Sequence, residues 1–528
     1  RNLALVGADG IDTDIEINGT LRALSTDGMI DIYAYASQDP ADADLDVITI
    51  DAGAGQVFLR TDGTVDLRQG QIVSSTRITL AADGDIRGNQ DDNADIVGGN
   101  ANAELVIEDV RVLSSLDADV GHVWINQAES AENLMFLRSV AVHEVNSDRL
   151  VDLKTQGDLM EIGEIRAGST ITLRGLTDGS GNHLTTLQQL SANNTDSLIL
   201  GNRLQIMDFL SVDLTTDVDE LEVAGIGNPF SPADEFVRIA NEGDLLLDGV
   251  FAYIHASVDI TATGDLTVNE KIQTQEAGQS IALTSTGGSI VVKEKDGEEI
   301  ETVGGTATVS LSAADDIEIW TGIDVTSTGT VNLHAGGFIT DPTDAEMQPF
   351  ALDPTQTREI TAETLNITSA AGIGASNPAQ PGVWNTNPYA LDTNVERLII
   401  QGTSGEPGAS GEAYILERDG LPHLLANVEG DLNVLTLAGD IGIGTDELAV
   451  VTSSDGRVVL TAAGAITVNT INAVLGEVRL EAQNGNILDR TSGAPTITGS
   501  DLEFVATGTV GTAGNALDTQ TLGSSIVV

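Results

Sequence analysis

The stretch Leu460-Thr-Ala-Ala-Gly464-Ala-Ile466 contains the phrase that decides the fold. A large apolar residue is followed by three mostly small or polar residues, Gly, any residue, and then Ile, Leu or Val. Looser copies surround it, with 25 residues from Leu435 to Leu460 and 20 from Leu460 to Leu480. Further copies begin at Leu80, Leu153, Ile260, Leu333 and Phe504. A repeat of this length along the whole chain indicates one supersecondary unit stacked many times.

The residues within each repeat follow the pattern of short β-strands. Val478-Arg-Leu-Glu-Ala482 alternates apolar and polar residues, and Asn484-Gly485 then makes a turn into Asn486-Ile-Leu488. Alternation directs every second side chain inward, and Gly permits a backbone bend that a Cβ would obstruct. We therefore predict an all-β chain folded as a right-handed parallel β-helix, that is, a β-solenoid with coils of roughly 20–25 residues.

The repeat predicts how the chain is organised into domains. We expect residues 1–528 to form one continuous β-solenoid that is a segment of a longer polypeptide, because the phrase recurs from end to end and both ends read as cut from a longer chain. Three stretches depart from the repeat and predict loop insertions: 176–197, 341–359 and 376–390. Insertions of this kind project from a solenoid and often make its contacts.

The composition indicates a narrow aliphatic core and a strongly acidic surface. Hydrophobic residues make up 41% of the chain but aromatic residues only 3%, and there are 57 glycines. With 81 acidic residues against 23 basic ones the formal net charge is −58, which disfavours binding to nucleic acid or an anionic membrane. Cys is absent, so disulfides and thiolate metal sites are excluded.

These phrases resemble a known class of bacterial proteins. The Leu-Thr-Ala-x-Gly-x-Ile repeat, the Gly-Ile-Gly turn at 372–378 and the Ala-Leu-Asp-Thr blocks at 390–393 and 516–519 are similar to giant surface proteins of the filamentous-haemagglutinin type. That class includes large adhesins and two-partner-secreted exoproteins with β-helical shafts. The resemblance implies an exported, elongated protein at the bacterial cell surface or in the extracellular space, with roles such as adhesion and biofilm formation.

Paired acidic residues raise the alternative of an enzyme that cleaves polysaccharides. Asp91-Asp92 and Asp315-Asp316 are such pairs, and glycoside cleavage requires two carboxylates at a set separation. The Gly-His-Gly segment of polygalacturonases is approached only by Gly121-His-Val123, and an Arg-x-Lys segment is missing. Adjacent acids are also expected by chance among 81 acidic residues. We therefore nominate no catalytic residue and expect a non-catalytic protein.

Two other patterns suggest ligands. Residues 89–100 concentrate oxygen ligands and Gly, so Asp91, Asp92 and Asp95 form a candidate for weakly bound calcium, although a solvated acidic turn is the favoured interpretation. The spacing does not follow known calcium motifs, and no cofactor is required. Trp384 lies in a predicted loop and is a candidate contact for sugars, whereas Trp124 and Trp320 alternate within strand-like runs and are expected to pack.

The function predicted from these patterns is a structural and adhesive shaft. Its expected partners are cell-surface or extracellular-matrix polymers or other copies of the chain, with no nucleic acid and no membrane insertion of this segment. One alternative is a filament or sheath subunit that stacks end to end, because terminal strands expose unpaired edges. The other is a polysaccharide lyase or hydrolase on the same fold.

Overall fold

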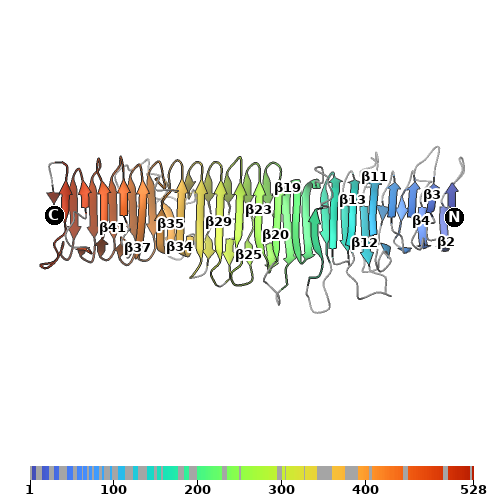
Figure 1. Cartoon of the computed structure of the whole chain (residues 1–528), viewed down its shortest axis with the longest axis horizontal. Coiled ribbons are helices and arrows are strands. Elements are labelled where there is room, and N and C mark those ends of the chain that lie inside the picture. Colours follow the sequence, from blue (N-terminus) through green and yellow to red (C-terminus); the bar gives the residue numbers. More distant parts are fainter. Residues whose placement is uncertain are drawn as a thin grey trace, which may run out of the picture. The chain divides into compact units, whose positions relative to one another are not determined.

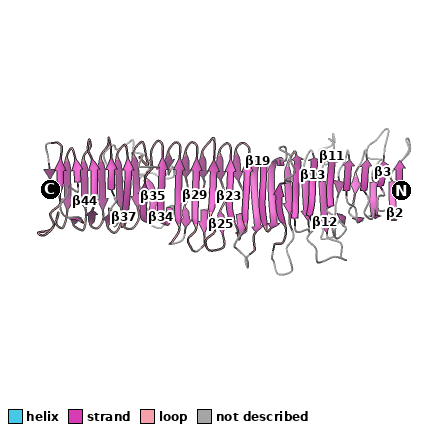
Figure 2. Ribbon diagram, viewed as in Figure 1, coloured by secondary structure: helices cyan, strands magenta, loops and turns pink. Residues whose placement is uncertain are grey.

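The computed structural model is all-β, and no helix occurs among the residues it describes (Figure 2). Strands one turn apart pair in parallel, and the paired residues include those that begin the repeated phrase. Leu460 lies opposite Leu480, and Leu480 lies opposite Phe504. The prediction of a parallel β-solenoid is confirmed.

The described residues form a series of ranges along the chain: 3–6, 15–22, 29–34, 45–51, 56–61, 64–67, 71–73, 77–82, 86–87, 96–97, 105–112, 123–128, 139–147, 151–155, 159–175, 183–189, 199–228, 235–248, 251–293, 300–303, 305–320, 322–325, 328–341, 360–374, 390–402, 407–443, 450–490, 497–523 and 526–528. Within them there is no helix that is both long and apolar enough to cross a membrane.

Contacts divide the chain into two units, Arg1–Ile260 and Thr261–Val528. The prediction of one continuous solenoid over both units stays a prediction. The strands that begin in the first unit are β1 (Leu3–Val6), β2 (Ile15–Arg22), β3 (Met29–Ala34), β4 (Leu45–Asp51), β5 (Gln56–Thr61), β6 (Val65–Asp66), β7 (Gln71–Val73), β8 (Arg77–Ala82), β9 (Ile86–Arg87), β10 (Ile96–Val97), β11 (Leu105–Val112), β12 (Val123–Ala128), β13 (Ser139–Ser147), β14 (Val151–Thr155), β15 (Leu159–Ala167), β16 (Thr170–Arg174), β17 (Thr186–Gln189), β18 (Ile199–Phe209), β19 (Ser211–Ile226), β20 (Phe236–Asn241), β21 (Leu245–Leu247), β22 (Phe251–Ile254) and β23 (Ser257–Ala262).

The second unit contains the strands drawn from yellow-green to red in Figure 1. They are β24 (Leu266–Val268), β25 (Ile272–Thr274), β26 (Ile281–Ser285), β27 (Ile290–Val292), β28 (Ile300–Thr302), β29 (Thr308–Ala313), β30 (Ile317–Ile319), β31 (Ile323–Val325), β32 (Thr330–Ala335), β33 (Ile339–Thr340), β34 (Ile360–Ser369), β35 (Leu391–Ile400), β36 (Ala413–Glu417), β37 (His423–Val428), β38 (Leu432–Thr436), β39 (Ile441–Gly442), β40 (Val450–Ser453), β41 (Val458–Ala462), β42 (Ile466–Val468), β43 (Thr470–Ala473), β44 (Val478–Ala482), β45 (Ile487–Asp489), β46 (Ile497–Gly499), β47 (Leu502–Ala506), β48 (Thr519–Thr521) and β49 (Ile526–Val527).

The core of each unit is built by the alternation read from the sequence. In β26, Ile281 and Leu283 are buried, whereas Ala282 and Thr284 between them are partly exposed. Each inward aliphatic side chain lies over its counterpart on the paired strand, as Leu283 does with Leu311. Full burial of such a side chain contributes about 1.5–3 kcal/mol, so the stacked aliphatic residues supply most of the favourable free energy of folding.

A corner between two faces of the second unit adds hydrogen bonds from side chains to the backbone of the next turn. Asp265, Ser289, Asp316 and Phe338 precede strands that pair in register, so they occupy the same corner on successive turns. Asp265 Oδ1 accepts the N–H of Ser289 at 2.8 Å, and Asp316 Oδ1 accepts that of Phe338 at 2.6 Å. Ser289 Oγ accepts the N–H of Asp316 at 3.3 Å. A side-chain oxygen therefore links each of these turns to the next.

The same corners explain the Gly of the repeated phrase. A Cβ on Gly288 would lie 2.3 Å from Asp265 Oδ1, and one on Gly337 would lie 2.0 Å from Asp316 Oδ1. Neither Gly has φ in the left-handed region, so the requirement is space for the neighbouring turn rather than the bend that the sequence suggested. The arrangement recurs at 2.1 Å for Gly464 over Asp440 and for Gly508 over Asn486.

The predicted loop insertions fall mostly outside the described residues. Only Asp341 of 341–359 and Ala390 of 376–390 are described. Within 176–197 the structure describes 183–189, and Thr186–Gln189 form β17, which pairs with β15 and β19. That part of the segment therefore belongs to the strand ladder.

Candidate functional site

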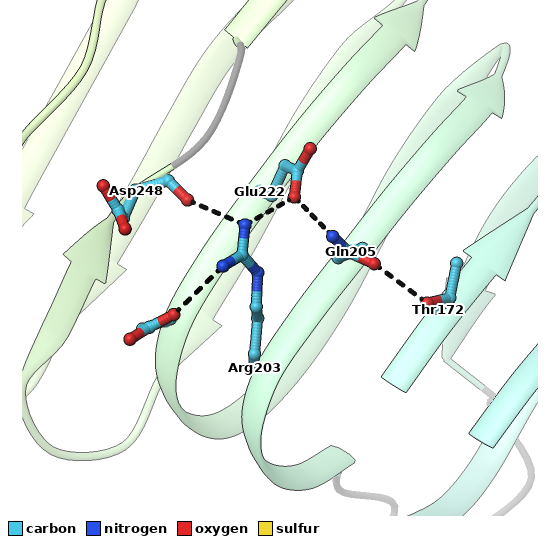
Figure 3. Close-up of polar contacts among 6 residues, drawn as sticks. Thr172, Arg203, Gln205, Glu222 and Asp248 are labelled. Carbon is cyan, nitrogen blue, oxygen red and sulfur yellow. Dashed lines mark hydrogen bonds and ion pairs between the residues drawn. The ribbon is translucent and has the colours of Figure 1, made fainter. Parts of the chain in front are cut away.

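A chain of polar side chains crosses the outward face of β16, β18 and β19 in the first unit (Figure 3). Pairing in register places Thr172, Gln205 and Glu222 opposite one another. Thr172 Oγ1 donates to Gln205 Oε1 at 3.0 Å, and Gln205 Nε2 donates to Glu222 Oε2 at 2.6 Å. The strand register therefore creates an outer polar ladder that no local sequence motif marks.

Arg203 is the positively charged centre of this ladder. Its Nη2 donates to Glu222 Oε2 at 2.8 Å and to the carbonyl oxygen of Asp248 at 3.5 Å, while Nη1 lies 3.5 Å from Glu220 Oε2. The hydrogen bond to Glu222 and the surrounding carboxylates raise the pKa of Arg203, although partial burial opposes them. The guanidinium stays charged and joins three consecutive stretches of the chain, which is a cross-linking role.

A second cluster lies on the outward face of β25, β28 and β31 in the second unit. Gln273, Glu301 and Asp324 lie opposite one another in register. Lys271 Nζ lies 2.7 Å from Glu301 Oε2, and Gln273 Nε2 donates to the same oxygen at 2.5 Å. Burial, followed by the charge of Glu301, raises the pKa of Asp324, and Lys271 opposes that rise. Two carboxyl groups on neighbouring strands, one of them with a raised pKa, are the residue types that an acid–base pair requires.

Glu417, at the end of β36, is a fully buried carboxylate with a structural role. Its Oε2 accepts the hydroxyl of Thr393 at 2.8 Å and the N–H of Val395 at 3.2 Å, and its Oε1 accepts the N–H of Asp419 at 3.3 Å. Donors from the previous turn and its own corner offset the cost of burying its polar oxygens. Glu417 is therefore held as an anchor within the core.

A strained corner in the first unit brings a histidine beside an aspartate. Asp208 has φ of 65°, and Gly225, which lies beside it one turn later, has φ of 63°. His183 Nδ1 lies 3.9 Å from Asp208 Oδ1, and a Cβ on Gly225 would lie 2.8 Å from the same oxygen. The left-handed bend is thus repeated on two turns, and only Gly fits the second one.

Of the acidic residues considered as sites from the sequence, the structure describes only Asp315 and Asp316. Asp91, Asp92 and Asp95, the calcium candidates, lie outside the described residues. Asp316 uses Oδ1 to accept the N–H of Phe338, and the carbonyl oxygen of Asp315 accepts the N–H of Gly337, so this pair serves the corner. In the described parts of the chain, no group of three or more His, Asp or Glu side chains is placed to hold a metal ion.

The tryptophans considered as sugar contacts are placed only in part. Trp320 follows β30 and is half-buried, with its Nε1 donating to Glu318 Oε2 at 3.0 Å. Trp124 lies in β12, where the backbone alone is described, and Trp384 lies outside the described residues. The sequence patterns did not identify Glu301 and Asp324. These two residues are separated by the length of one turn, and that spacing could have identified them as neighbours.

Comparison of the chain with family models, with curated proteins and with solved structures finds no match.

Proposed function

We propose that this chain is the non-catalytic structural and adhesive shaft of an exported bacterial cell-surface or extracellular filamentous protein. The observation that carries the proposal is the double linkage between turns. Strands pair in parallel around an aliphatic core, and oxygens such as Asp316 Oδ1 and Asn486 Oδ1 link the corners of successive turns. A stack linked in this way resists bending and leaves the outward side chains available for contacts.

The charge of the chain supports the same role. A formal net charge of −58 keeps neighbouring copies apart and keeps the chain soluble outside the cell. The described clusters around Arg203 and Glu417 use their polar groups within the chain. Adhesion would then come from outward faces that carry few charges.

The adhesive role can be tested with beads that carry the purified chain. Coated beads should bind to surfaces covered with extracellular polysaccharide or matrix protein, and beads carrying heat-unfolded chain should not. Equal retention of folded and unfolded chain would contradict the proposal. Electron microscopy of the same sample separates isolated particles from long fibres, and long fibres would favour the end-to-end filament.

One observation favours a second candidate, a polysaccharide lyase or hydrolase. Glu301 and Asp324 provide neighbouring carboxyl groups with Lys271 beside them. If the chain were such an enzyme, sugar release from pectin or alginate would be lost in Glu301→Gln and kept in Glu318→Gln, a change on another face. Under the shaft proposal, neither protein releases sugar.

A further inference from the structure

One outward face of the second unit is polar but has no Asp, Glu, Lys or Arg among its outward residues. It is formed by β26, β29, β32 and the second half of β34, which pair in register. We call it the neutral face, and its outward residues are Ala282, Thr284, Thr308, Ser310, Ser312, Thr330, Asn332, His334, Thr364, Asn366 and Thr368. All are at least partly exposed, and the residues between them are buried. The face is therefore open, and it consists almost entirely of hydroxyl and amide groups.

Hydrogen bonds orient the amides at the centre of this face. Asn332 Nδ2 donates to Ser310 Oγ at 3.1 Å, and Asn366 Nδ2 donates to Asn332 Oδ1 at 2.8 Å. A primary amide has two N–H donors and an oxygen with two lone pairs, so both amides keep hydrogen-bonding capacity for a ligand. Because their orientation is already fixed, binding through them costs little side-chain entropy.

This face lacks Asp, Glu, Lys and Arg, although the chain as a whole is strongly acidic. The same turns carry Glu301, Glu318 and Asp324, but these lie on other outward faces. Asp315 and Glu363 lie at the corners that border the neutral face. Arg397 of β35 lies opposite Thr364, so the borders carry both signs of charge, whereas the face itself offers an uncharged polymer mainly hydroxyl and amide partners, with one imidazole at His334. The charge distribution therefore favours a neutral ligand.

An exposed aromatic ring lies at the edge of the same face. Phe338 follows β32 at the corner and is 51% exposed. Its ring lies near Gly372 of the next turn, where a Cβ would come within 3.4 Å of Phe338 Cε1. An exposed ring offers an apolar surface on which the C–H face of a sugar can pack.

The spacing of the neutral face suits an extended polymer. Neighbouring strands lie about 4.8 Å apart, and alternate residues along a strand lie about 6.6 Å apart. Four strands therefore present hydrogen-bonding groups at regular intervals over roughly 14 Å. A chain of several sugar rings can contact successive turns through its hydroxyl groups.

We propose that the neutral face binds an uncharged polysaccharide, with Asn332 and Asn366 as hydrogen-bonding residues and Phe338 as the stacking residue. The proposal rests on the adhesive function above and gives that function a class of ligand. Its specificity comes from matched hydroxyl and amide groups, and its selectivity against polyanions comes from the net charge of −58 on the chain.

The test measures binding of the full chain to neutral polysaccharides (dextran, galactomannan and laminarin) and to the polyanion alginate, by affinity electrophoresis and calorimetry. We expect at least one neutral polymer to bind and alginate not to bind. Asn332→Asp with Asn366→Asp, and separately Phe338→Ala, should each weaken binding at least tenfold. Thr330→Glu, at a position whose side chain makes no hydrogen bond to replace, should also weaken binding. It takes the place of the paired variant if that variant folds poorly. Thr267→Asp adds a charge on another face and is the matched control, with circular dichroism melting to verify folding.

Several outcomes would overturn the proposal. They are binding to none of the three neutral polymers, equal binding of alginate, and unchanged binding in all of the face variants. Thermal hysteresis of ice growth without glycan binding would assign the face to ice and overturn it as well. If coated beads still adhere to the polymer surfaces while the face variants leave polysaccharide binding unchanged, this inference fails and the shaft function stands. If neither beads nor free chain bind any polymer, both fail.

Discussion

The region around β18 and β19 in the first unit and the corner region of the second unit link their turns in different ways. In the first, charged side chains cross between strands, as Arg203 does to Glu222 at 2.8 Å. In the second, carboxylate or amide oxygens accept backbone N–H groups, as Asp440 Oδ1 does from Ala465 at 2.6 Å. Both linkages join residues that are far apart in the sequence and adjacent in the stack.

The fold should depend less on the charge pairs than on the corner hydrogen bonds. Partly exposed charge pairs are screened by salt and contribute little each, so they modulate the strand faces. A corner oxygen satisfies a backbone donor, and its position depends on a Gly that leaves room for it, so the corners are built into the fold. The corners should therefore tolerate substitution least.

The largest effect is expected from Gly464→Ala. Its Cβ would lie 2.1 Å from Asp440 Oδ1 and 2.7 Å from the carbonyl oxygen of Gly439, so two turns must separate. We expect a loss of about 3 kcal/mol in the free energy of unfolding, measured by urea denaturation. Gly514→Ala is the control, because no atom lies within 4 Å of its Cβ. Equal losses in the two variants would contradict the role of the corner.

The next largest effect is expected at the corner oxygen itself. Asp316→Ala leaves the N–H of Phe338 without its acceptor and should cost about 1–2 kcal/mol. Asp316→Asn should cost much less, because Asn486 already accepts the N–H of Thr509 at 2.7 Å in another turn. Amide hydrogen exchange at Phe338 provides the measurement, and it should accelerate in the Ala variant alone. Similar exchange in both variants would show that the oxygen is dispensable.

A smaller effect that depends on salt is expected in the first unit. Glu222→Gln removes the charge that faces Arg203 and should cost up to about 1 kcal/mol at low ionic strength. The loss should fade in 1 M sodium chloride, since that salt shortens the screening length to about 3 Å. Asp213→Asn, whose partner Arg238 is 54% exposed, should change the melting temperature hardly at all. A loss for Glu222→Gln that persists at high salt would indicate packing rather than charge.

The smallest effect concerns the pH dependence of Asp324. Burial and Glu301 raise the pKa of Asp324 above its ordinary value of 3.8. The folded state therefore holds the proton more tightly than the unfolded state, and the stabilisation present below pH 3.8 is lost as pH rises through the raised pKa. Asp324→Asn should raise the melting temperature slightly at pH 7 and not at pH 3. The gain should shrink in a Glu301→Gln background, and a gain independent of both pH and Glu301 would refute this explanation.

The sequence was sufficient to predict the stack but not the side-chain links between its turns. Alternation around Leu460, Leu480 and Phe504 predicted parallel stacking, because one residue type recurs at one inward position. The outer ladder could not be predicted, since turn lengths vary: Thr172 bonds Gln205 across 33 residues, and Gln205 bonds Glu222 across only 17. Cross-strand partners can be matched only when the length of every turn is known.

The direction of the corner hydrogen bonds bears on how the chain folds. At the Gly corners the oxygen belongs to the earlier turn and the N–H to the later one, from Asp265 to Ser289 and from Asn486 to Thr509, whereas Glu417 accepts from the earlier Val395. A completed turn therefore presents an acceptor already fixed in place for residues that have yet to fold. Adding a turn needs no new nucleus, because the existing edge acts as a template. A chain emerging from a narrow pore, amino-terminal turns first, could fold one turn at a time and never leave a long unfolded stretch exposed.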